Sequence, residues 1–462
     1  MLETITAVNQ AVNSFIWGIP AMVCIIGVGL LLSVRTGFLQ LRKFPYAIKT
    51  TIGRIFRKKD ASDGAMTPFQ AVCTALAATV GTGNIVGVAT AIKAGGPGAL
   101  FWMWVAAFFG MATKYAEGVL AVKYREVDDQ GNISGGPMYY IKNGLGDKWK
   151  PLGTLFAIFG VLVAYFGIGT FAQVNSIIDI ANITFGVSPY VVGGIITVLV
   201  AAITLGGLQS IAKTAEKIIP TMAVLYFLVT VSILVIFADQ IPHAVYQIIH
   251  DAFTPTAATG GFLGATVMLA MRSGIARGVF SNESGLGSAP IVAAAAKTKW
   301  PAEQGLISMT GTFIDTIIIC TLTGLTLVVT GVWKGDLNGA ALTNAAFAQA
   351  YPAFGSYLLC ACLALFAFTT ILGWNYYGER CMIYLAGTKA ILPYRIVFIL
   401  LIASAAFLKL EVIWTLADIV NGLMAIPNLI ALIGLSGVVV AETRRFNEHV
   451  KEEESKTEKE IA

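Results

Sequence analysis

The feature of this sequence that most constrains its fold is the length of its uncharged, apolar stretches. The long stretches without a charged side chain include residues 4–34, 64–92, 94–113, 151–178, 180–212, 218–238, 252–271 and 337–378. A helix needs about 20 mostly apolar residues to cross the hydrocarbon core of a bilayer. Only 12% of all residues are charged, which is roughly half the share in soluble domains. These stretches predict an all-α polytopic membrane protein in contact with the lipid bilayer.

Polar and Gly/Pro-rich turns divide the chain into eleven predicted transmembrane helices. Their extents are residues 12–34, 67–93, 98–122, 152–181, 189–209, 216–238, 262–296, 302–331, 354–386, 391–408 and 412–440. Five parts follow: an extra N-terminal helix in 1–34, a basic cytoplasmic interfacial segment in 35–66, five helices in 67–238, five more in 262–440, and a charged cytoplasmic tail in 441–462. We expect the end of this tail, residues 451–462, to be solvated and disordered because charges dominate it.

The distribution of lysine and arginine supports eleven spans, because positively charged loops remain on the cytoplasmic side of a membrane. With eleven spans, the tail and the connections after odd-numbered spans hold 26 of these residues when helix ends are included. The other connections hold only Lys93, Lys334 and Lys409, and Arg272 and Arg277 lie within the seventh span. This segregation predicts a protein of the plasma (inner) membrane with its N-terminus outside and its C-terminus in the cytoplasm.

Two predicted spans contain glycine and polar clusters at mid-membrane depth. The second contains ATVGTGNIVG at residues 78–87, and the seventh contains MRSGIARGVFSNESGLGSAP at residues 271–290. With the first span set aside, each cluster heads a set of five spans, and the two sets have opposite orientations because five is odd. Broken helices at matching positions of inverted halves indicate the midplane site of a secondary transporter. For either cluster alone, close helix packing is an equal alternative.

Other classes of function lack residues that they need. The three histidines lie apart from the six cysteines, which argues against a His/Cys zinc site. No P-loop motif occurs, and we expect no organic cofactor. Ser281 and Ser284 lie beside Glu283, but a G-x-S-x-G elbow and an intramembrane histidine are missing, so a hydrolase is not expected. A channel is the alternative that saturation and ion coupling would exclude. The net charge of +5 follows from membrane orientation and does not indicate nucleic-acid binding, and no obligate protein partner is evident.

Three stretches resemble those of a known family. GGPGALFWMWVAAFFG at residues 95–110 is similar to the signature of the alanine/glycine:cation symporter family. GTGNIVGVATAI at 81–92 and GVFSNESGLGSAP at 278–290 resemble other characteristic stretches of that family. The resemblance covers the chain from the first span to the last. It implies a LeuT-type five-plus-five inverted repeat preceded by one extra helix, and sodium- or proton-coupled uptake of small neutral amino acids, chiefly alanine and glycine.

A zwitterionic amino acid needs hydrogen-bond donors for its carboxylate and acceptors for its ammonium group, and an unwound helix offers both. The resemblance implies substrate contacts from both breaks and two further helices. The candidates are Thr79, Gly81, Thr82 and Gly83 in the first break, Ser273 and Gly274 in the second, Gln173, and Trp374 as an aromatic wall that shortens the pocket. Gln173 could instead form an interhelical hydrogen bond, and Trp374 could be structural. Asn84 could contact substrate or tie the hinge together.

Sodium takes about five or six hard oxygen ligands, which hydroxyl groups and freed carbonyls can supply without a carboxylate. Thr369 and Thr370 are adjacent in the ninth span, where the resemblance places the side-chain ligands of the fold's sodium site. The matching carbonyls would belong to Ala77, Val80 and Phe366. As an alternative, the threonine hydroxyls bond to carbonyls of their own helix.

Charged residues inside a membrane are costly and are usually paired or functional. We expect Asp418 and an arginine of the seventh span, either Arg272 or Arg277, to form an outer gate, with Asp179 as a competitor for that arginine. Static pairing of the helix ends is an equal alternative.

Two more intramembrane carboxyl groups leave the coupling ion open. Glu283 lies in the seventh span and Asp315 in the eighth. Either could carry a coupled proton, so Na⁺ is the expected coupling ion and H⁺ the alternative.

Overall fold

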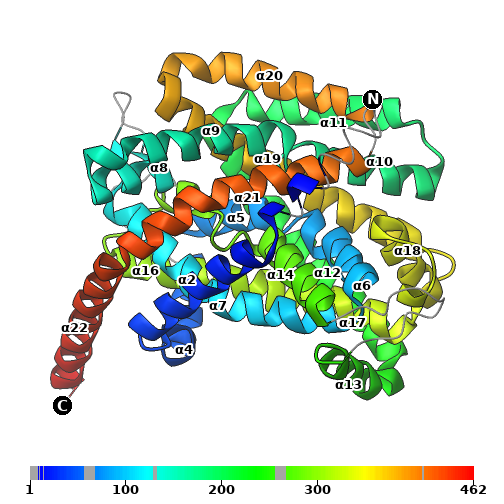
Figure 1. Cartoon of the computed structure of the whole chain (residues 1–462), viewed down its shortest axis with the longest axis horizontal. Coiled ribbons are helices and arrows are strands. Elements are labelled where there is room, and N and C mark those ends of the chain that lie inside the picture. The colour runs from blue at the N-terminus through cyan, green and yellow to red at the C-terminus, as the bar shows by residue number, and fades with distance from the viewer. Residues whose placement is uncertain are drawn as a thin grey trace.

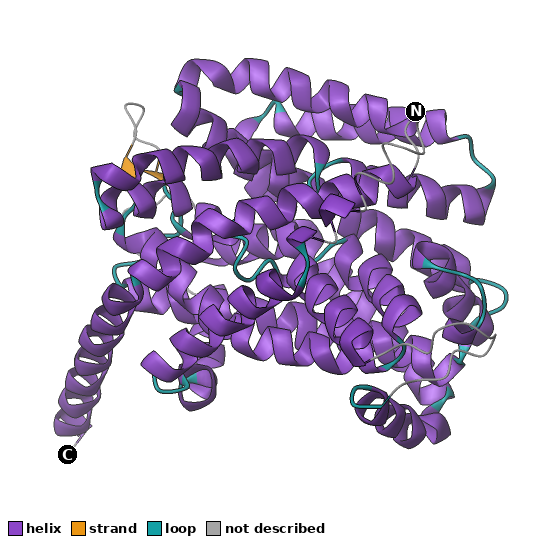
Figure 2. Cartoon of the chain, in the orientation of Figure 1, coloured by secondary structure: helices purple, strands orange, loops and turns teal. Residues whose placement is uncertain are grey.

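The computed structural model describes residues 9, 11–13, 15–56, 68–127, 133–254, 267–407 and 410–461. Helices make up nearly all of the described chain, as Figure 2 shows. The one sheet in these residues is a short antiparallel hairpin of β1 (Glu126–Val127) and β2 (Ile133–Ser134), in which Glu126 pairs with Ser134. The predicted all-α class therefore describes the architecture apart from this hairpin.

Helices lie in each of the first six predicted ranges. They are α2 (Ile19–Arg35), α5 (Pro68–Thr79), η1 (Gly83–Gly87), α6 (Val88–Gly95), α7 (Gly98–Lys123), α9 (Lys150–Phe166), α10 (Phe171–Phe185), α11 (Pro189–Thr204) and α12 (Gly207–Ile236). Shorter helices connect them: α3 (Leu39–Arg42), α4 (Phe44–Phe56), α8 (Pro137–Tyr140), η2 (Ile141–Leu145), η3 (Asp147–Trp149), η4 (Ala238–Gln240) and α13 (Ile241–Asp251).

The second half of the chain fills the other five ranges. The elements within these ranges include α14 (Val267–Asn282), α15 (Ala289–Ala293), α16 (Pro301–Thr312), η5 (Phe313–Cys320), α17 (Thr321–Thr330), α19 (Gly355–Ala386), α20 (Ile391–Ser404) and α21 (Leu410–Gly434). The others are η6 (Val332–Lys334), α18 (Gly339–Ala350), η7 (Thr388–Ala390), η8 (Ala405–Phe407) and the terminal α22 (Ser436–Ile461). Figure 1 shows α9, α11, α20 and α21 running in similar directions along the long axis of the view.

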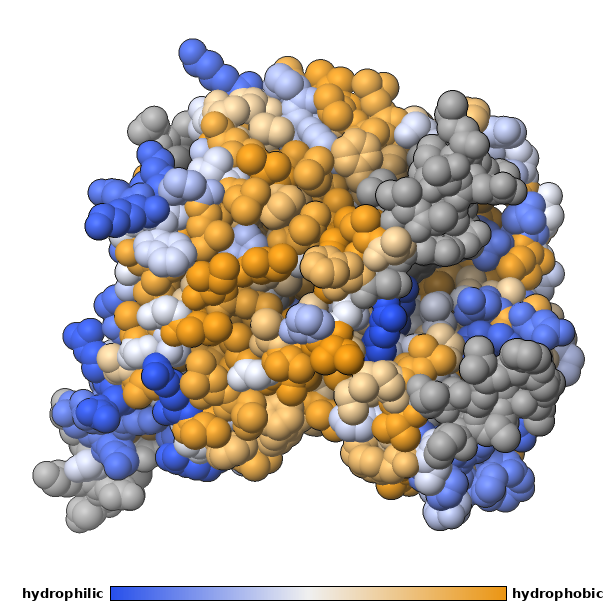
Figure 3. All heavy atoms as spheres, in the orientation of Figure 1, coloured by the Kyte–Doolittle hydropathy of each residue, from blue (hydrophilic) through white to orange (hydrophobic). Residues whose placement is uncertain are grey.

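The number of membrane crossings is smaller by a strict criterion than the sequence predicts. In the described residues, seven helices are long and apolar enough to cross a membrane, or eight if α5 and the segment after its 45° bend form one span. The helices α2 and α11 are apolar but shorter. The count of eleven is therefore not confirmed. Figure 3 shows hydrophobic residues across the middle of one face and hydrophilic residues gathered toward its two ends, as expected for a membrane-embedded surface.

The C-terminal tail is helical, so the expectation of disorder is wrong. The helix α22 continues to Ile461 and projects from the body of the molecule in Figure 1. Its first half packs against α7 and α16: Phe446 and Val450 are buried, and the Thr443 hydroxyl lies 2.8 Å from the Tyr115 hydroxyl. Charge alone did not predict these contacts, because Phe446 and Val450 recur at helical spacing among the charges.

The helix α7 lies between α14 and α16 and packs extensively on both. Glycines make this possible because they let two backbones approach closely. A Cβ on Gly118 would lie 2.9 Å from the Cα of Gly305 of α16. A Cβ on Gly274 of α14 would overlap the carbonyl oxygen of Ala99 and lie 2.8 Å from the Cβ of Trp102. These contacts hold α14, which ends at the second break, against α7.

We expect Gly274→Ala to destabilise the protein by about 1–3 kcal/mol, because overpacking forces the α7 and α14 backbones apart. The readout is the midpoint of thermal unfolding in detergent. Gly194→Ala in α11 is the matched control, since an added Cβ there meets no atom within 4 Å. Equal midpoints for the two variants would contradict the packing described for α7 and α14.

Candidate functional site

The first break separates α5 from η1. In a regular helix the amide of Gly81 would donate to the carbonyl of Ala77. Here it donates to Oδ1 of Asn84 at 2.9 Å, and the amide of Asn84 donates to the carbonyl of Gly81 at 3.2 Å instead of that of Val80. The Asn84 side chain thus accepts the backbone amide of Gly81. The carbonyls of Ala77 and Val80 do not receive the helical hydrogen bonds from Gly81 and Asn84.

Asn84 also ties the first break to the second half of the chain. Its Nδ2 donates to Oδ1 of Asp315 on η5 at 2.7 Å. The other carboxylate oxygen of Asp315 accepts the hydroxyls of Ser281 at 2.9 Å and Thr316 at 2.8 Å. Asp315 is fully buried, and its three donors offset the cost of burying a carboxylate. Asn84 therefore connects the first break to η5 in this structure, and both roles expected for it stay predictions.

The released carbonyls meet α19 at Thr370. The Thr370 hydroxyl oxygen lies 3.1 Å from the carbonyl oxygen of Ala77, 3.4 Å from that of Val80 and 3.1 Å from that of Phe366. A hydroxyl has one proton, so it can satisfy only one of the three carbonyls strongly. The Thr370 hydroxyl and the two released carbonyls form an oxygen set of the kind that hard cations prefer. The Phe366 carbonyl completes the cluster and also accepts the Thr369 hydroxyl at 3.0 Å.

Within this oxygen cluster, the Thr369 hydroxyl contacts the Phe366 carbonyl. This hydroxyl lies 3.6 Å from the sulfur of Met222 on α12 and bonds to the carbonyls of Leu365 and Phe366 in its own helix, both at 3.0 Å. This is the alternative geometry that the sequence left open for threonine in a membrane helix. Its part in cation binding stays a prediction.

Gln173 faces the first break from α10. Its Oε1 accepts the amide of Thr82 at 3.2 Å. Within the described chain, Nε2 of Gln173 and the hydroxyl of Thr82 are buried without a hydrogen-bond partner. Buried polar atoms are rarely left unpaired in folded proteins. Two such atoms beside an unwound segment fit the charged ends of a small amino acid.

A third break brings Gln173 into place, and the sequence interpretation missed it. The predicted span 152–181 is interrupted at residues 167–170, between α9 and α10. A Cβ on Gly169 would lie 2.7 Å from the Cβ of Trp374, so α19 approaches here only because Gly169 lacks a side chain. The Gly-Ile-Gly pattern at residues 167–169 was the available signal.

The second break begins later than the predicted contacts assumed. The helix α14 continues to Asn282, and the chain then turns through residues 283–288 before α15. Gly274 lies against α7, and Ser273 precedes Ser281 by eight residues, or about 12 Å along the helix. The segment that α14 brings to the first break is instead Phe280 and Ser281: a Cβ on Gly83 would lie 3.0 Å from the Cα of Ser281. A substrate role for Ser273 and Gly274 stays a prediction.

The remaining substrate candidates, Thr79 and Trp374, differ in their surroundings. The Thr79 hydroxyl bonds to the carbonyl of Ala75 in α5 at 3.1 Å. Trp374 is fully buried on α19, one turn after Thr370, and its Nε1 donates to Oε1 of Glu283 at 2.9 Å. The indole therefore lies between the first break and the start of the second.

The expected gate residues form a close ion pair. The two terminal nitrogens of the Arg277 guanidinium group donate to the carboxylate of Asp418 on α21, at 2.9 and 2.8 Å. The two side chains are only 17% and 11% exposed. Asp418 is held further by Trp17 of the N-terminal segment, whose Nε1 donates to its backbone carbonyl at 2.9 Å. Arg277, rather than Arg272, is the arginine that pairs with Asp418, and Asp179 takes no part in this pair.

Three polar residues near the second break were not predicted. Glu117 of α7 accepts the amide of Gly285 at 3.1 Å and Nδ2 of Asn428 at 2.7 Å, and Asn428 also donates to the Gly285 carbonyl at 2.9 Å. Lys114 is 3% exposed, although the sequence counted it with the cytoplasmic charges. Its Nζ is buried without a hydrogen-bond partner among the described residues. The signal that could have found them is charge within an apolar span, which is costly unless it is used.

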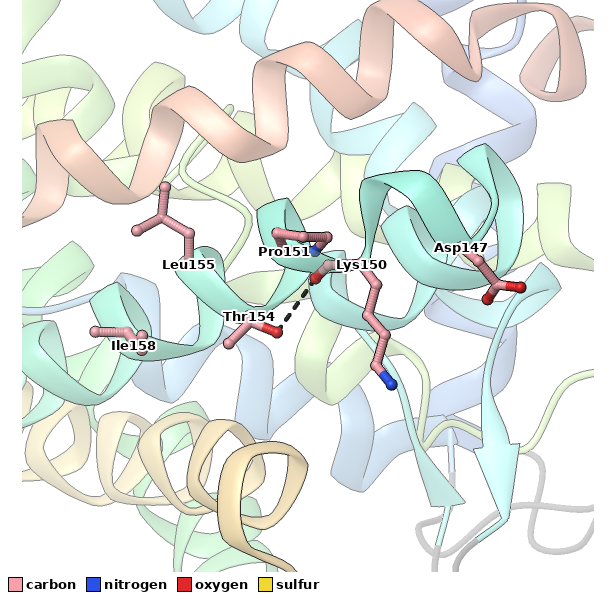
Figure 4. A pocket seen from close by; sticks show the side chains of 6 residues that line it. All are labelled: Asp147, Lys150, Pro151, Thr154, Leu155 and Ile158. Carbon is pink, nitrogen blue, oxygen red and sulfur yellow. Dashed lines mark hydrogen bonds between the residues drawn. The ribbon is translucent and has the colours of Figure 1, made fainter.

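The described chain has a small cavity near the first break and larger hollows on its outer surface. A small cavity of about 30 Å³ between α5, α7 and α16 is lined by Thr79, Lys114 and Gln304, among others. The open hollow in Figure 4, about 560 Å³, follows the surface of α9 past Lys150, Leu155 and Ile158. None of the residues that meet at the breaks lines the larger hollow, so size alone does not identify the site.

Comparison with known proteins gives a consistent result. A family model described as the sodium:alanine symporter family matches residues 2–460. An uncharacterized transporter of Haemophilus influenzae is 54% identical over 450 residues, which cover 97% of each chain. The sodium/alanine symporter AgcS of Methanococcus maripaludis is 50% identical over 458 residues, which cover 98% of this chain and 99% of that protein. These matches, with the apolar helices, show a multi-pass membrane protein.

A solved structure supports the same fold at much lower sequence similarity. MhsT in complex with L-phenylalanine has a TM-score of 0.56 and 11% sequence identity, and the match covers 83% of this chain and 99% of that chain. At this identity the likeness concerns the fold alone.

We expect Asn84→Ala to loosen the first break, because the amide of Gly81 and the carboxylate of Asp315 would each lose a buried partner. Each loss costs about 1–3 kcal/mol. Hydrogen exchange of a peptide that spans residues 77–86 should become faster, and the unfolding midpoint should fall. In the control Asn182→Ala, an exposed amide loses its bond to the Val187 carbonyl. Unchanged exchange in Asn84→Ala would refute the hinge role.

Proposed function

Because the chain belongs to the sodium:alanine symporter family, we propose that it couples uptake of small neutral amino acids, chiefly alanine and glycine, to a sodium gradient by alternating access. One observation carries the proposal: a single short segment contacts both an oxygen cluster suited to a cation and the side-chain amide of Gln173, whose Nε2 has no hydrogen-bond partner in the described chain. The carbonyls of Ala77 and Val80 surround the Thr370 hydroxyl, and the amide of Thr82 faces Gln173. The name of the relative AgcS, a sodium/alanine symporter, supports this pairing of ion and substrate.

We propose the membrane arrangement that the charges predict. The chain would cross the plasma membrane eleven times as a five-plus-five inverted repeat after one extra helix, with its N-terminus outside and its C-terminus in the cytoplasm. Helices in all eleven ranges and the segregation of basic residues support it. Broken helices at the head of each set of five, which meet at Gly83 and Ser281, support the repeat.

The proposed cation site consists of the carbonyls of Ala77, Val80 and Phe366 and the hydroxyl of Thr370, with Thr369 as a further candidate ligand. Sodium is a hard cation that accepts neutral oxygen ligands. The oxygen cluster fits it because the carbonyls released by the break exceed the protons available to them. A bound cation would supply the positive charge that this cluster lacks.

The proposed substrate site lies directly beside the cation site. Gln173 and Thr82 would bind the charged ends of the amino acid, Gly81 and Gly83 would allow the backbone to approach it, and Trp374 would limit its length. A Cβ on Gly81 would overlap the Thr370 hydroxyl and lie 3.3 Å from Oε1 of Gln173. Ion and substrate would therefore order the same residues, so each would strengthen binding of the other.

We expect Thr370→Val to weaken apparent sodium affinity by at least about tenfold, or ~1.4 kcal/mol, because it removes the side-chain oxygen of the cluster. The measurement is uptake of labelled alanine into proteoliposomes at varied sodium, with a pH gradient at matched membrane potential as the comparison. Thr369→Val is the matched control, and its smaller effect would follow from the bonding of Thr369 within its own helix. Accumulation driven by protons alone would assign coupling to Asp315 or Glu283 and overturn the sodium assignment.

We expect Asp418→Asn to open the outer side, because a buried ion pair that loses one partner is destabilised by about 3–5 kcal/mol. The readout is labelling of Ala276→Cys, in a cysteine-free background, by an impermeant thiol reagent added outside. Labelling should rise several-fold. The control Glu379→Gln breaks another buried pair, with Arg395 at 2.6 Å, and should leave labelling unchanged. Equal labelling in Asp418→Asn and the parent would leave the pair a static contact.

A further inference from the structure

The second break and the proposed pocket wall share one side chain. Glu283 is the first residue after α14, and both it and Trp374 are fully buried. Oε1 of Glu283 accepts the indole Nε1 of Trp374 at 2.9 Å, and Oε2 accepts the hydroxyl of Ser288 at 2.6 Å. Because Ser288 immediately precedes α15, one carboxylate closes the loop of the second break and also holds the indole of α19.

The backbone of Glu283 is strained for a residue with a side chain. Its φ is +57°, and the only other non-glycine residue with positive φ in the described chain is Phe38. Glycine adopts this conformation without penalty, and any other residue pays a steric cost. Two glycines follow in the same turn, Gly285 and Gly287, each with positive φ. A glutamate kept where glycine would fit better indicates that its side chain is used.

Trp374 lies on α19 beside residues that contact the first break. Its neighbour Gly373 packs on α5, since a Cβ there would lie 2.7 Å from that of Ala78. Thr370, one turn earlier, contacts the carbonyls of Ala77 and Val80. On the other side of Trp374, Gly169 permits close approach of the third break. The hydrogen bond to Glu283 fixes the orientation of the buried indole.

We propose that Glu283 is a specificity-determining positioning residue: by binding the Trp374 indole and the Ser288 hydroxyl together, it fixes the wall that excludes larger amino acids and links that wall to the second break. This inference rests on the proposed function. Movement of α15 would pull Ser288 from the carboxylate and release the wall, so pocket length would change with the state of the break.

This role differs from that of a proton carrier in a way that one variant can reveal. Glutamine at position 283 keeps an oxygen that accepts from Trp374, and its NH₂ group can donate to the Ser288 oxygen. It cannot take up and release a proton. Glycine removes both hydrogen bonds without adding backbone strain, since φ is positive.

The experiment measures selectivity in proteoliposomes, as the ratio of inhibition constants of methionine and alanine for sodium-driven alanine uptake. Glu283→Gly should lower this ratio by at least about tenfold, the effect of a single methylene in an apolar pocket. Glu283→Gln should keep most of the ratio. Trp374→Phe should match Glu283→Gly, and the double variant should show no further loss, because both changes remove the same hydrogen bond. The control is Glu379→Gln, which changes another buried carboxylate, on α19.

Each result decides the question. An unchanged ratio in Glu283→Gly overturns the positioning role, and so does additivity with Trp374→Phe. Loss of ion-driven uptake in Glu283→Gln, with selectivity of binding retained, assigns Glu283 to proton transfer instead. If a variant binds but does not transport, the ratio is taken from ligand-induced shifts in unfolding temperature. If the parent protein accumulates no alanine under a sodium gradient, the proposed function fails independently of this inference.

Discussion

A helix that breaks inside a membrane must satisfy the backbone groups that it frees, because no lipid can do so. At the break after α5, the side chain of Asn84 meets that need for the amide of Gly81, and the carbonyls of Ala77 and Val80 are left facing Thr370. The oxygen cluster is thus a consequence of how the break is satisfied. The same turn directs the amide of Thr82 outward to Gln173. The way in which this break is satisfied therefore leaves the groups that we propose for both the cation and the substrate.

Buried charges hold the two breaks against each other. Asp315 accepts hydrogen bonds from the first break through Asn84 and from α14 through Ser281. Glu117 and Glu283 bind the loop of the second break, at the amide of Gly285 and the hydroxyl of Ser288 respectively. A buried carboxylate is tolerated only when it is well hydrogen-bonded or paired. The charges near these breaks therefore specify their relative position more than they add to stability.

The sequence predicted the location of the helices and of the first break because long apolar runs and a Gly-Thr-Gly-Asn cluster are local signals. It also placed Thr370 opposite Ala77 and Val80, through family resemblance and not through spacing. It did not fix where the second break lies within residues 271–290: α14 continues through Gly274, which packs on α7, and the positive φ appears at Glu283. It counted Lys114 among loop charges. Whether a glycine bends a helix or admits a neighbour depends on tertiary contacts, which periodicity does not contain.

At the sites that we propose, coupling between ion and substrate would follow from the shortness of the segment that they share. Gly81 is enclosed by Thr370 of α19 and Gln173 of α10, so closely that even a Cβ would overlap the hydroxyl. A cation that draws the carbonyls of Ala77 and Val80 toward Thr370 must therefore also move the amide of Thr82 relative to Gln173. The effect would need no long pathway, because only Gly81 lies between the proposed cation ligand Val80 and the amide of Thr82. Tight packing around one glycine would convert cation binding into a change of the substrate site.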